Sequence, residues 1–277
     1  MKKIGFIDYY LDEWHANNYP EFIKNQSNGR YEVCYAYGMI DSPTGGMTNK
    51  EWSEKYNIPL LDTIEEVIEK SDVLIVLSPD NPEMHLELTH LPLKSGKLVY
   101  VDKTFAVDKE SALRIFANAE AHNTPCYSSS ALYFSTELND IDTDKIVKLY
   151  SRGPGAYDVY SIHQIEPIIK LMKADPKRVM FLGDKSHPSM VIEFADGRLA
   201  QMHQGIWIDF EIAVTDEENT MKIYTIKSDY FMLFIQSLVE FFDTGVAPVS
   251  HQQTVNVIAT IDAGRKAAEN PFTWVEV

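Results

Sequence analysis

Two side chains in this sequence have the types and positions needed for acid–base chemistry. Lys103 lies two residues after an apolar run at residues 98–101, and His163 lies where a helical stripe of isoleucines begins. A lysine amine and an imidazole can move the proton of a substrate hydroxyl group and orient the substrate. Asp158 precedes His163 by five residues and could hold its imidazole in one tautomer. We therefore expect Lys103, His163 and Asp158 to be catalytic, with Lys103 and His163 facing each other across a cleft between two domains.

Lys103 belongs to a stretch, residues 72–105, that predicts a strand–helix–strand crossover. The continuous apolar run at residues 73–77 is typical of a parallel strand buried on both faces, and residues 98–101 predict the next strand. Such crossovers are right-handed, and the carboxyl ends of both strands lie at the sheet edge where ligands bind. Ser78, Pro79 and Lys103 are therefore predicted to lie together at a ligand-binding edge.

The first predicted strand, residues 3–7, is followed by a turn that is unusual for a nucleotide-binding domain. Glycines in this turn normally let the backbone approach a pyrophosphate at a helix N-terminus. Here the turn contains no glycine, several bulky side chains and three carboxylates, those of Asp8, Asp12 and Glu13. The sequence therefore argues against a phosphate cradle of the usual type.

The remaining elements predict two domains of different architecture. Strand and helix patterns alternate over residues 1–125, including a Thr63/Glu66 capping box and a helix starting at Asp108, which predicts a Rossmann-like, doubly wound parallel sheet. Residues 126–277 predict an α+β domain with an open antiparallel sheet, since Asp196-Gly197 is a strong hairpin turn between two alternating strands. A helix with its first turn at Pro167 and two apolar closing helices complete this domain.

Composition excludes several classes of function. The chain of 277 residues carries 41 acidic against 25 basic residues and a net charge of −16, which disfavours binding to nucleic acid. The sequence shows no signal peptide and no apolar run long enough to cross a membrane, and its histidines lack the spacing of a metal site. Only Cys34 and Cys126 are present, which favours two free thiols in a reducing cytoplasm.

Four segments together resemble the Gfo/Idh/MocA family of oxidoreductases, in matching order along nearly the whole chain. They are EKYNIP (54–59), DKTFA (102–106), SIHQIE (161–166) and the helix pair around APVS (247–250). The resemblance implies a Rossmann domain followed by an open-sheet domain, and an NAD(P)-dependent activity on sugars or cyclitols. It also implies a catalytic role for Lys103 and a substrate-side role for His163.

The sequence departs from the family pattern mainly where the cofactor would bind. The glycine motif is missing, Thr104 replaces a proline, Asp102 replaces a glutamate, and Asp158 stands five rather than four residues before the histidine. The loop that precedes His85 is also longer. With the family as guide, the residues expected to contact NAD or NADP are Asp8, Ser78, Pro79, His85 and Lys103.

Three functions remain open on the sequence. The first is an NAD(P)-dependent oxidoreductase acting on a sugar, cyclitol or related polyhydroxylated small molecule. The second is a carbohydrate-binding or regulatory protein without dinucleotide binding, and the third a non-redox lyase or epimerase. A homo-oligomer is expected through the exposed face of the C-terminal sheet. Met190, Ile192 and Phe194 share one face of their strand, so only that face must be covered within the domain and the other stays exposed.

Overall fold

The computed structural model describes residues 1–277 and divides the chain into two compact units. Unit 1 consists of Met1–Ser129 and Ile235–His251, and unit 2 of Ser130–Phe234 and Gln252–Val277. The first boundary thus falls after Ser129 rather than after residue 125, and a late segment returns to unit 1. Aromatic contacts explain this return, because Phe242 packs on Tyr31 and Phe241 on Tyr127.

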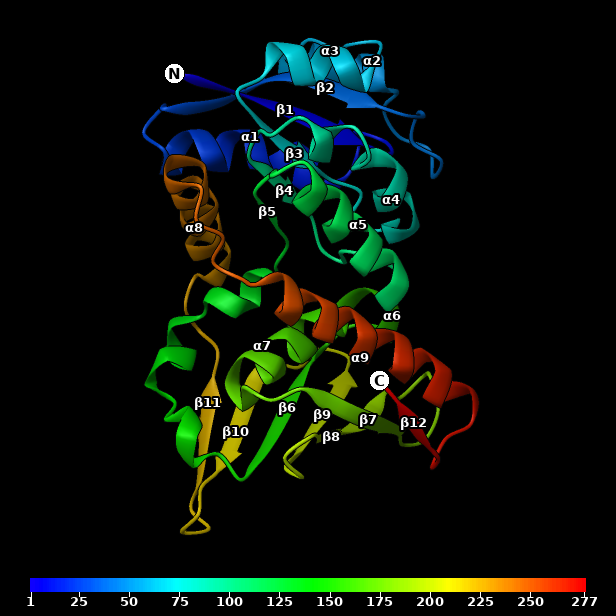
Figure 1. The fold of residues 1–277 in the computed structure, drawn as a ribbon, viewed down its shortest axis with the longest axis vertical. Helices are drawn as coiled ribbons and strands as arrows, with labels where there is room; N and C mark the ends of the chain where they lie inside the picture. The colour runs from blue at the N-terminus through cyan, green and yellow to red at the C-terminus, as the bar shows by residue number, and fades with distance from the viewer. The chain divides into compact units, whose positions relative to one another are not determined.

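The core of unit 1 is a five-stranded parallel sheet with the order β2-β1-β3-β4-β5, which confirms the predicted Rossmann-like fold (Figure 1). The strands β3 and β4 are apolar and fully buried because the sheet is covered on both faces. The strand bounds are β1 Lys2–Asp8, β2 Tyr31–Gly38, β3 Val73–Val76, β4 Val99–Val101 and β5 Cys126–Tyr127.

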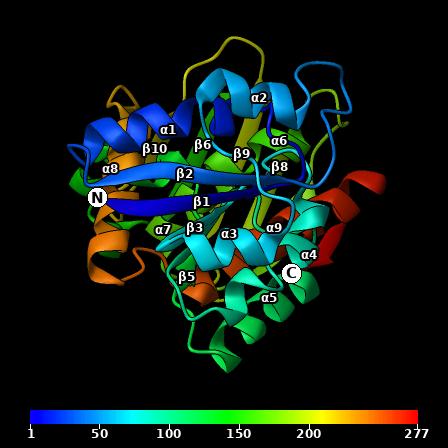
Figure 2. The same cartoon turned by 90° about the horizontal axis from the view of Figure 1, so that it is seen from above.

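Helix α1 covers one side of this sheet, and α3 and α5 cover the other (Figure 2). The predicted starts of α3 and α5 are confirmed: Thr63 accepts a hydrogen bond from the Glu66 amide at 3.2 Å, and Asp108 accepts one from the Ser111 amide at 2.7 Å. The helices are α1 Trp14–Gln26, α2 Asn49–Tyr56, α3 Ile64–Lys70, α4 His85–Leu88, α5 Lys109–Ala121 and, spanning the unit boundary, α8 Tyr230–Thr244.

Unit 2 contains a seven-stranded sheet with the order β11-β10-β6-β9-β8-β7-β12. All neighbouring strands are antiparallel except β6 and β9, so the sheet is mixed rather than purely antiparallel. Gly197 has a φ of +86° in the predicted turn between β8 and β9. The strands are β6 Lys148–Pro154, β7 Pro176–Phe181, β8 Ser189–Phe194, β9 Leu199–Gly205, β10 Glu211–Thr215, β11 Met221–Thr225 and β12 Trp274–Glu276.

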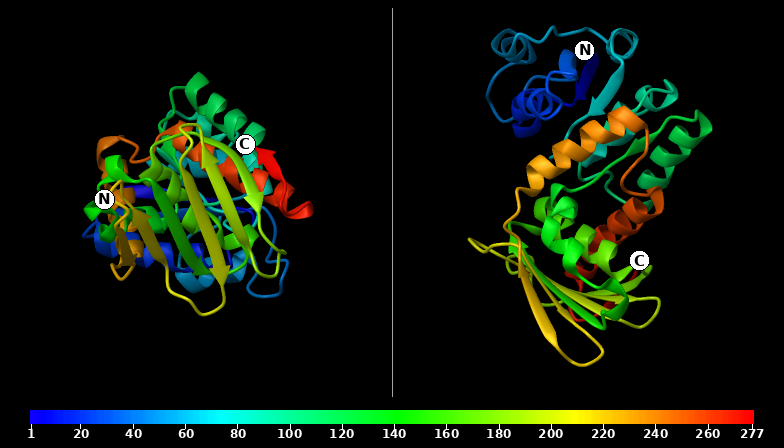
Figure 3. Two further views of the ribbon diagram at one scale, coloured as in Figure 1. Left: turned by 90° about the horizontal axis from the view of Figure 1, so that it is seen from below. Right: turned by 90° about the vertical axis from the view of Figure 1, so that its left-hand side faces the viewer.

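Helix α7 packs on one face of this sheet, and the other face carries no helix of unit 2 (Figure 3, left). The helices here are α6 Tyr157–Tyr160, α7 Ile162–Met172 and α9 His251–Glu269. Five single-turn 3₁₀ helices complete the chain, at Pro82–Met84, Pro92–Lys94, Ala131–Phe134, Thr136–Asp140 and Thr143–Lys145.

The prediction that Pro167 lies in the first turn of its helix is wrong, because Pro167 is the sixth residue of α7. Ser161, which joins α6 to α7, has helical φ and ψ of −58° and −32°. The two helices therefore follow each other almost without interruption. The buried isoleucine face of α7 compensates for the backbone hydrogen bond that proline cannot donate.

Candidate functional site

Lys103 lies at the carboxyl end of β4, where the sequence places it. Its side chain is only 8% exposed, and its ammonium group forms no hydrogen bond or ion pair. The backbone beneath it is fixed, because one carboxylate oxygen of Asp102 accepts from the Lys103 amide at 2.8 Å and from the Tyr100 hydroxyl at 3.1 Å. The peptide bond between Lys103 and Thr104 is cis. A nearly buried ammonium without a counter-ion is available to an incoming polar or anionic group.

Ser78 and Pro79 are buried at the end of β3, at the same edge of the sheet as Lys103. Ser78 adopts a φ of +83°, and its hydroxyl donates to the carbonyl of Asn81 at 3.0 Å. The structure therefore brings Ser78, Pro79 and Lys103 to the predicted edge.

The ring of His85 lies inside the protein, against the backbone, and is not exposed at the ligand-binding edge. Its ring is fully buried, with Nε2 2.6 Å from the Leu77 carbonyl and Nδ1 3.0 Å from the Phe105 carbonyl. Burial lowers the pKa of His85, and a neutral ring donates to one of these two carbonyl oxygens while its other nitrogen only lies against the second. His85 thus ties the loop after β3 to the loop after β4. It can position these loops, but it offers no free nitrogen to a cofactor.

The turn between β1 and α1 places a carboxylate where a phosphate would be expected. Glu13 is the N-cap of α1, and its carboxylate accepts hydrogen bonds from the amides of His15, at 2.7 Å, and Ala16. The His15 ring lies 3.1 Å from Glu13 and 3.5 Å from Asp102. This contact links the start of α1 to the segment that carries Lys103.

Asp8, at the end of β1, is buried beside this carboxylate. Burial raises the pKa of Asp8 well above its usual value, and the negative charges of Glu13 and Asp102 raise it further. Its Oδ2 atom has no hydrogen-bond partner. The raised pKa favours the protonated form of Asp8 over that of an exposed carboxyl, so burial weakens its contribution to the negative charge of the turn.

In unit 2, His163 is the second residue of α7 and belongs to a hydrogen-bonded group. Its Nδ1 lies 2.7 Å from the Ser130 hydroxyl, and the amide of Ser130 donates to the buried carboxylate of Glu166. Tyr160 and Phe210 pack edge-on against the imidazole, with ring centroids 5.3 and 6.0 Å away. The Ser130 hydroxyl thus fixes the orientation of the imidazole through Nδ1.

Asp158 does not occupy the orienting position expected for it. Its carboxylate is 72% exposed and pairs with Arg265 at 2.8 Å. Residues five apart on a helix point about 140° away from each other, whereas residues four apart share a face. Ser130 holds Nδ1 of His163 instead. The sequence could not identify Ser130, because its contact with His163 depends on tertiary structure.

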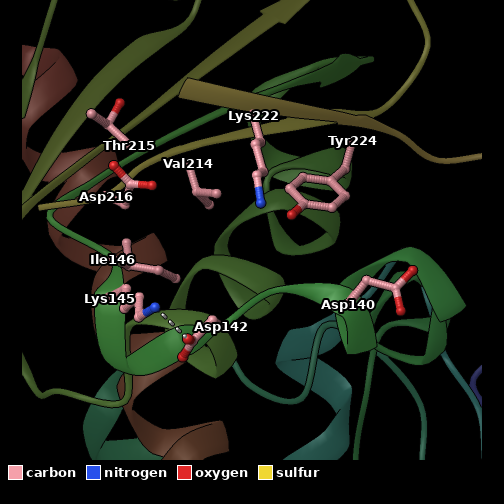
Figure 4. A pocket seen from close by; sticks show the side chains of 9 residues that line it. All are labelled: Asp140, Asp142, Lys145, Ile146, Val214, Thr215, Asp216, Lys222 and Tyr224. Carbon is pink, nitrogen blue, oxygen red and sulfur yellow. Dashed lines mark ion pairs between the residues drawn. The ribbon is translucent and has the colours of Figure 1, made fainter. Parts of the chain in front are cut away.

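A shallow pocket elsewhere in unit 2 contains none of the predicted residues (Figure 4). It has a volume of about 150 Å³ between the Asp142–Lys145 ion pair, at 3.7 Å, and the side chains of Lys222 and Tyr224. No three His, Cys, Asp or Glu side chains are grouped so that they could hold a metal ion. No helix has both the length and the apolar character of a membrane span.

Comparison with known proteins shows similarity at the level of structure. No protein-family model matches the chain, and no curated protein matches its sequence. GenD2 from gentamicin A biosynthesis, solved in complex with NAD, is 13% identical with a TM-score of 0.78, covering 100% of this chain and 97% of GenD2. A scyllo-inositol dehydrogenase from Lactobacillus casei, with bound NAD(H) and scyllo-inositol, is 13% identical with a TM-score of 0.78, covering 99% and 98%.

A probable dehydrogenase from Thermotoga maritima is similar to the same extent, at 15% identity and a TM-score of 0.76, covering 99% of this chain and 98% of that protein. Matches of this length include both units and leave no large part of the chain without a counterpart. The chain therefore has the same overall fold as these three proteins.

Proposed function

We propose that this protein is an oxidoreductase that acts on a small polyhydroxylated molecule, of the sugar or cyclitol class, with NAD or NADP as cofactor. The full-length likeness to GenD2, solved with NAD, and to a scyllo-inositol dehydrogenase, solved with NAD(H) and scyllo-inositol, supports the proposal. The observation that carries it is Lys103, an almost buried ammonium group without a partner at the ligand-binding edge of a Rossmann-like sheet. Such a group is suited to a substrate hydroxyl.

The donor set at the start of α1 has the chemistry that a dinucleotide needs. The amides of His15 and Ala16 already hold an anionic group, the carboxylate of Glu13, so they would suit a phosphate once that carboxylate moves away. Ser78 and Pro79 would contribute to the adjacent part of the site. A bound nicotinamide would supply or accept the hydride.

The chain's own residues would handle the proton and the orientation of the substrate. We assign the proton of the substrate hydroxyl to Lys103: its neutral amine would take up this proton as the hydride leaves the substrate, and its ammonium form would return it in the reverse direction. A hydrogen bond to the substrate is assigned to the imidazole of His163. Ser130 would hold the imidazole through Nδ1, at 2.7 Å. Asp158 has no part in this assignment, because it pairs with Arg265.

The proposal is tested by following dinucleotide reduction against a panel of sugars and inositols, at cofactor concentrations up to several millimolar. Lys103→Met and His163→Ala should each lower turnover by about 100-fold or more, the size expected for loss of an acid–base or orienting group. Lys94→Met, at an exposed lysine of unit 1, is the matched control and should keep full activity. Failure to reduce either dinucleotide with any substrate would reject the proposal.

A second candidate function is sugar binding, or non-redox lyase or epimerase chemistry, without a dinucleotide. The Glu13 carboxylate at the α1 amides favours it, because this carboxylate occupies the place of a phosphate. Thermal-shift measurements with sugars and inositols, with and without NAD(P), separate the two. Stabilisation by a sugar that no dinucleotide enhances would favour the second candidate.

We further propose that the protein forms a homo-oligomer through the helix-free face of the unit 2 sheet. Strand register aligns one row across this face: Val191, Gln201, Tyr150, Ala213 and Ile223. Ile223 is 64% exposed at the end of the row. Exposed apolar side chains such as Ile223 on an uncovered sheet face are typical of an interface. The two free cysteines, Cys34 and Cys126, support a reducing compartment such as the cytoplasm.

A further inference from the structure

The start of α1 is occupied by the chain itself. In a doubly wound sheet the helix after the first strand directs its free amides toward the ligand edge, and a ligand's pyrophosphate normally binds there. In this protein the carboxylate of Glu13 accepts hydrogen bonds from the amides of both His15 and Ala16, and Glu13 is almost buried. The amides that would bind a phosphate are therefore already satisfied.

We propose that Glu13 is an internal competitor that must leave the α1 amides before a dinucleotide diphosphate can bind, and so lowers the affinity for the cofactor. This inference rests on the proposed function, since it concerns the same site. A second observation points to an anionic ligand at this edge. The residue Lys103 is more than nine-tenths buried and its ammonium group has no hydrogen bond or ion pair, and its segment meets the start of α1 through the contact between Asp102 and His15, at 3.5 Å.

Of the three carboxylates in this turn, Glu13 is the one that lies on the α1 amides. The Asp8 carboxylate accepts from the Tyr9 amide and that of Asp12 from the Met47 amide, whereas Glu13 accepts from the amides of His15 and Ala16. A diphosphate approaching an intact Glu13 would meet like charge in a largely buried turn and would find the amides of His15 and Ala16 already bonded. Both costs disappear when the Glu13 carboxylate is removed or displaced.

The test is dinucleotide binding by Glu13 variants of the full chain, followed by NADH and NADPH fluorescence, with inorganic pyrophosphate as a competitor. Glu13→Ser removes the carboxylate and keeps a preferred N-cap residue, so α1 remains capped. We expect its Kd for NADH to be at least about 10-fold lower than that of the wild type. Glu13→Asp keeps a capping carboxylate and should show no such gain.

The matched control is Glu51→Gln, which neutralises a carboxylate in the first turn of another helix of unit 1, α2. It should bind NADH as the wild type does, which separates the local effect of Glu13 from the change in net charge. Circular dichroism checks that each variant is folded. If Glu13→Ser does not fold, Glu13→Gln gives the same comparison with a side chain of equal length.

The outcomes distinguish this inference from the proposed function. Tight wild-type binding that Glu13→Ser does not improve would overturn the inference and leave the proposed function intact. Absence of saturable binding in both proteins would overturn the inference together with the use of a dinucleotide. A gain in binding by Glu13→Ser without oxidation of any polyol would support the inference and reject the proposed activity.

Discussion

At the scale of single residues, the buried Asp8 makes stability depend on pH. Its pKa is raised well above the unfolded value of about 3.9, mainly by burial, so the folded state binds its proton more tightly. The folded state therefore loses stability as the pH rises from about 4 to the raised pKa, and the loss is complete above it. Asp8→Asn carries no such penalty. We expect its Tm at neutral pH to exceed the wild-type Tm by roughly 2 °C or more.

Thermal denaturation between pH 3 and 8 checks this expectation. The advantage of Asp8→Asn should shrink toward zero near pH 3, where Asp8 is protonated in both states. Asp62→Asn, at an exposed aspartate, is the control and should follow the wild type. A stabilisation of Asp8→Asn that is the same at every pH would mean that packing, rather than the charge of Asp8, is responsible.

The hydrogen bond between Ser130 and His163 gives a second prediction at this scale. Ser130→Ala removes the partner of Nδ1 and leaves the ring free to change tautomer or rotate, so turnover should fall by about 10-fold while the fold persists. The pH profile of turnover should also shift, which loss of packing alone would not cause. Asp158→Asn should leave both turnover and profile unchanged. Equal losses in the two variants would show that Ser130 has no special role.

At this scale, a residue's position could be predicted where neighbouring residues in the sequence determine it, and not where distant contacts do. Lys103, Ser78 and Pro79 follow apolar strands closely, so their place at the sheet edge could be predicted from neighbouring residues. The acidic turn at Asp8 and Glu13 could also be identified in the sequence. The role of Glu13 as the N-cap of α1 could not. An acidic residue directly before a helical pattern was the available signal. Ser130 and the burial of His85 depend on distant contacts and left no local signal.

At the scale of elements, helix α9 packs so closely in unit 2 that one methyl group matters. A Cβ added at Gly264 would lie 1.8 Å from the Tyr157 hydroxyl and 2.7 Å from the Met190 sulfur. The Tyr157 hydroxyl is itself fixed, since it donates to the Ile261 carbonyl at 3.1 Å. Gly264→Ala should therefore lower the free energy of unfolding by about 1–3 kcal/mol despite the better helix propensity of alanine.

Urea denaturation measures this loss. Lys266→Ala, at an exposed position of the same helix, should change the free energy of unfolding by less than about 0.5 kcal/mol. A Gly264→Ala variant as stable as the wild type would show that Tyr157 and α9 move apart without cost, and that the helix is held less tightly than these distances indicate.

The sequence predicts which segments are helices or strands more reliably than it predicts where one element joins or pairs with another. The strands of unit 1 and the hairpin at Gly197 depend on local patterns, and the structure confirms them. The position of Pro167 was predicted wrongly because a proline was assumed to mark a helix start, whereas α6 and α7 join through a helical Ser161. The parallel pairing of β6 and β9 was missed because these strands are not neighbours in the chain.

At the scale of the whole molecule, the chain passes between its two units three times, after Ser129, Phe234 and His251. The returning segment is anchored within unit 1, where Asp243 accepts from Arg30 at 2.5 Å and from the Tyr31 hydroxyl at 3.0 Å. A boundary drawn along the sequence cannot show such a return, because the apolar stripe of α8 is the same whichever unit it packs against.

The helix-free face of unit 2 carries the last prediction, which concerns assembly. Tyr150 and Ile223 flank Ala213 in the row that crosses this face, so Ile223→Glu places a charge at the edge of the proposed interface. Burying an unpaired charge is costly, so the variant should dissociate at protein concentrations where the wild type is oligomeric. Light scattering coupled to size exclusion measures the mass, with Leu113→Glu, at an exposed leucine of α5, as the control. If the wild type is a monomer at high micromolar concentration, this face does not bind a second copy of the chain and the prediction is wrong.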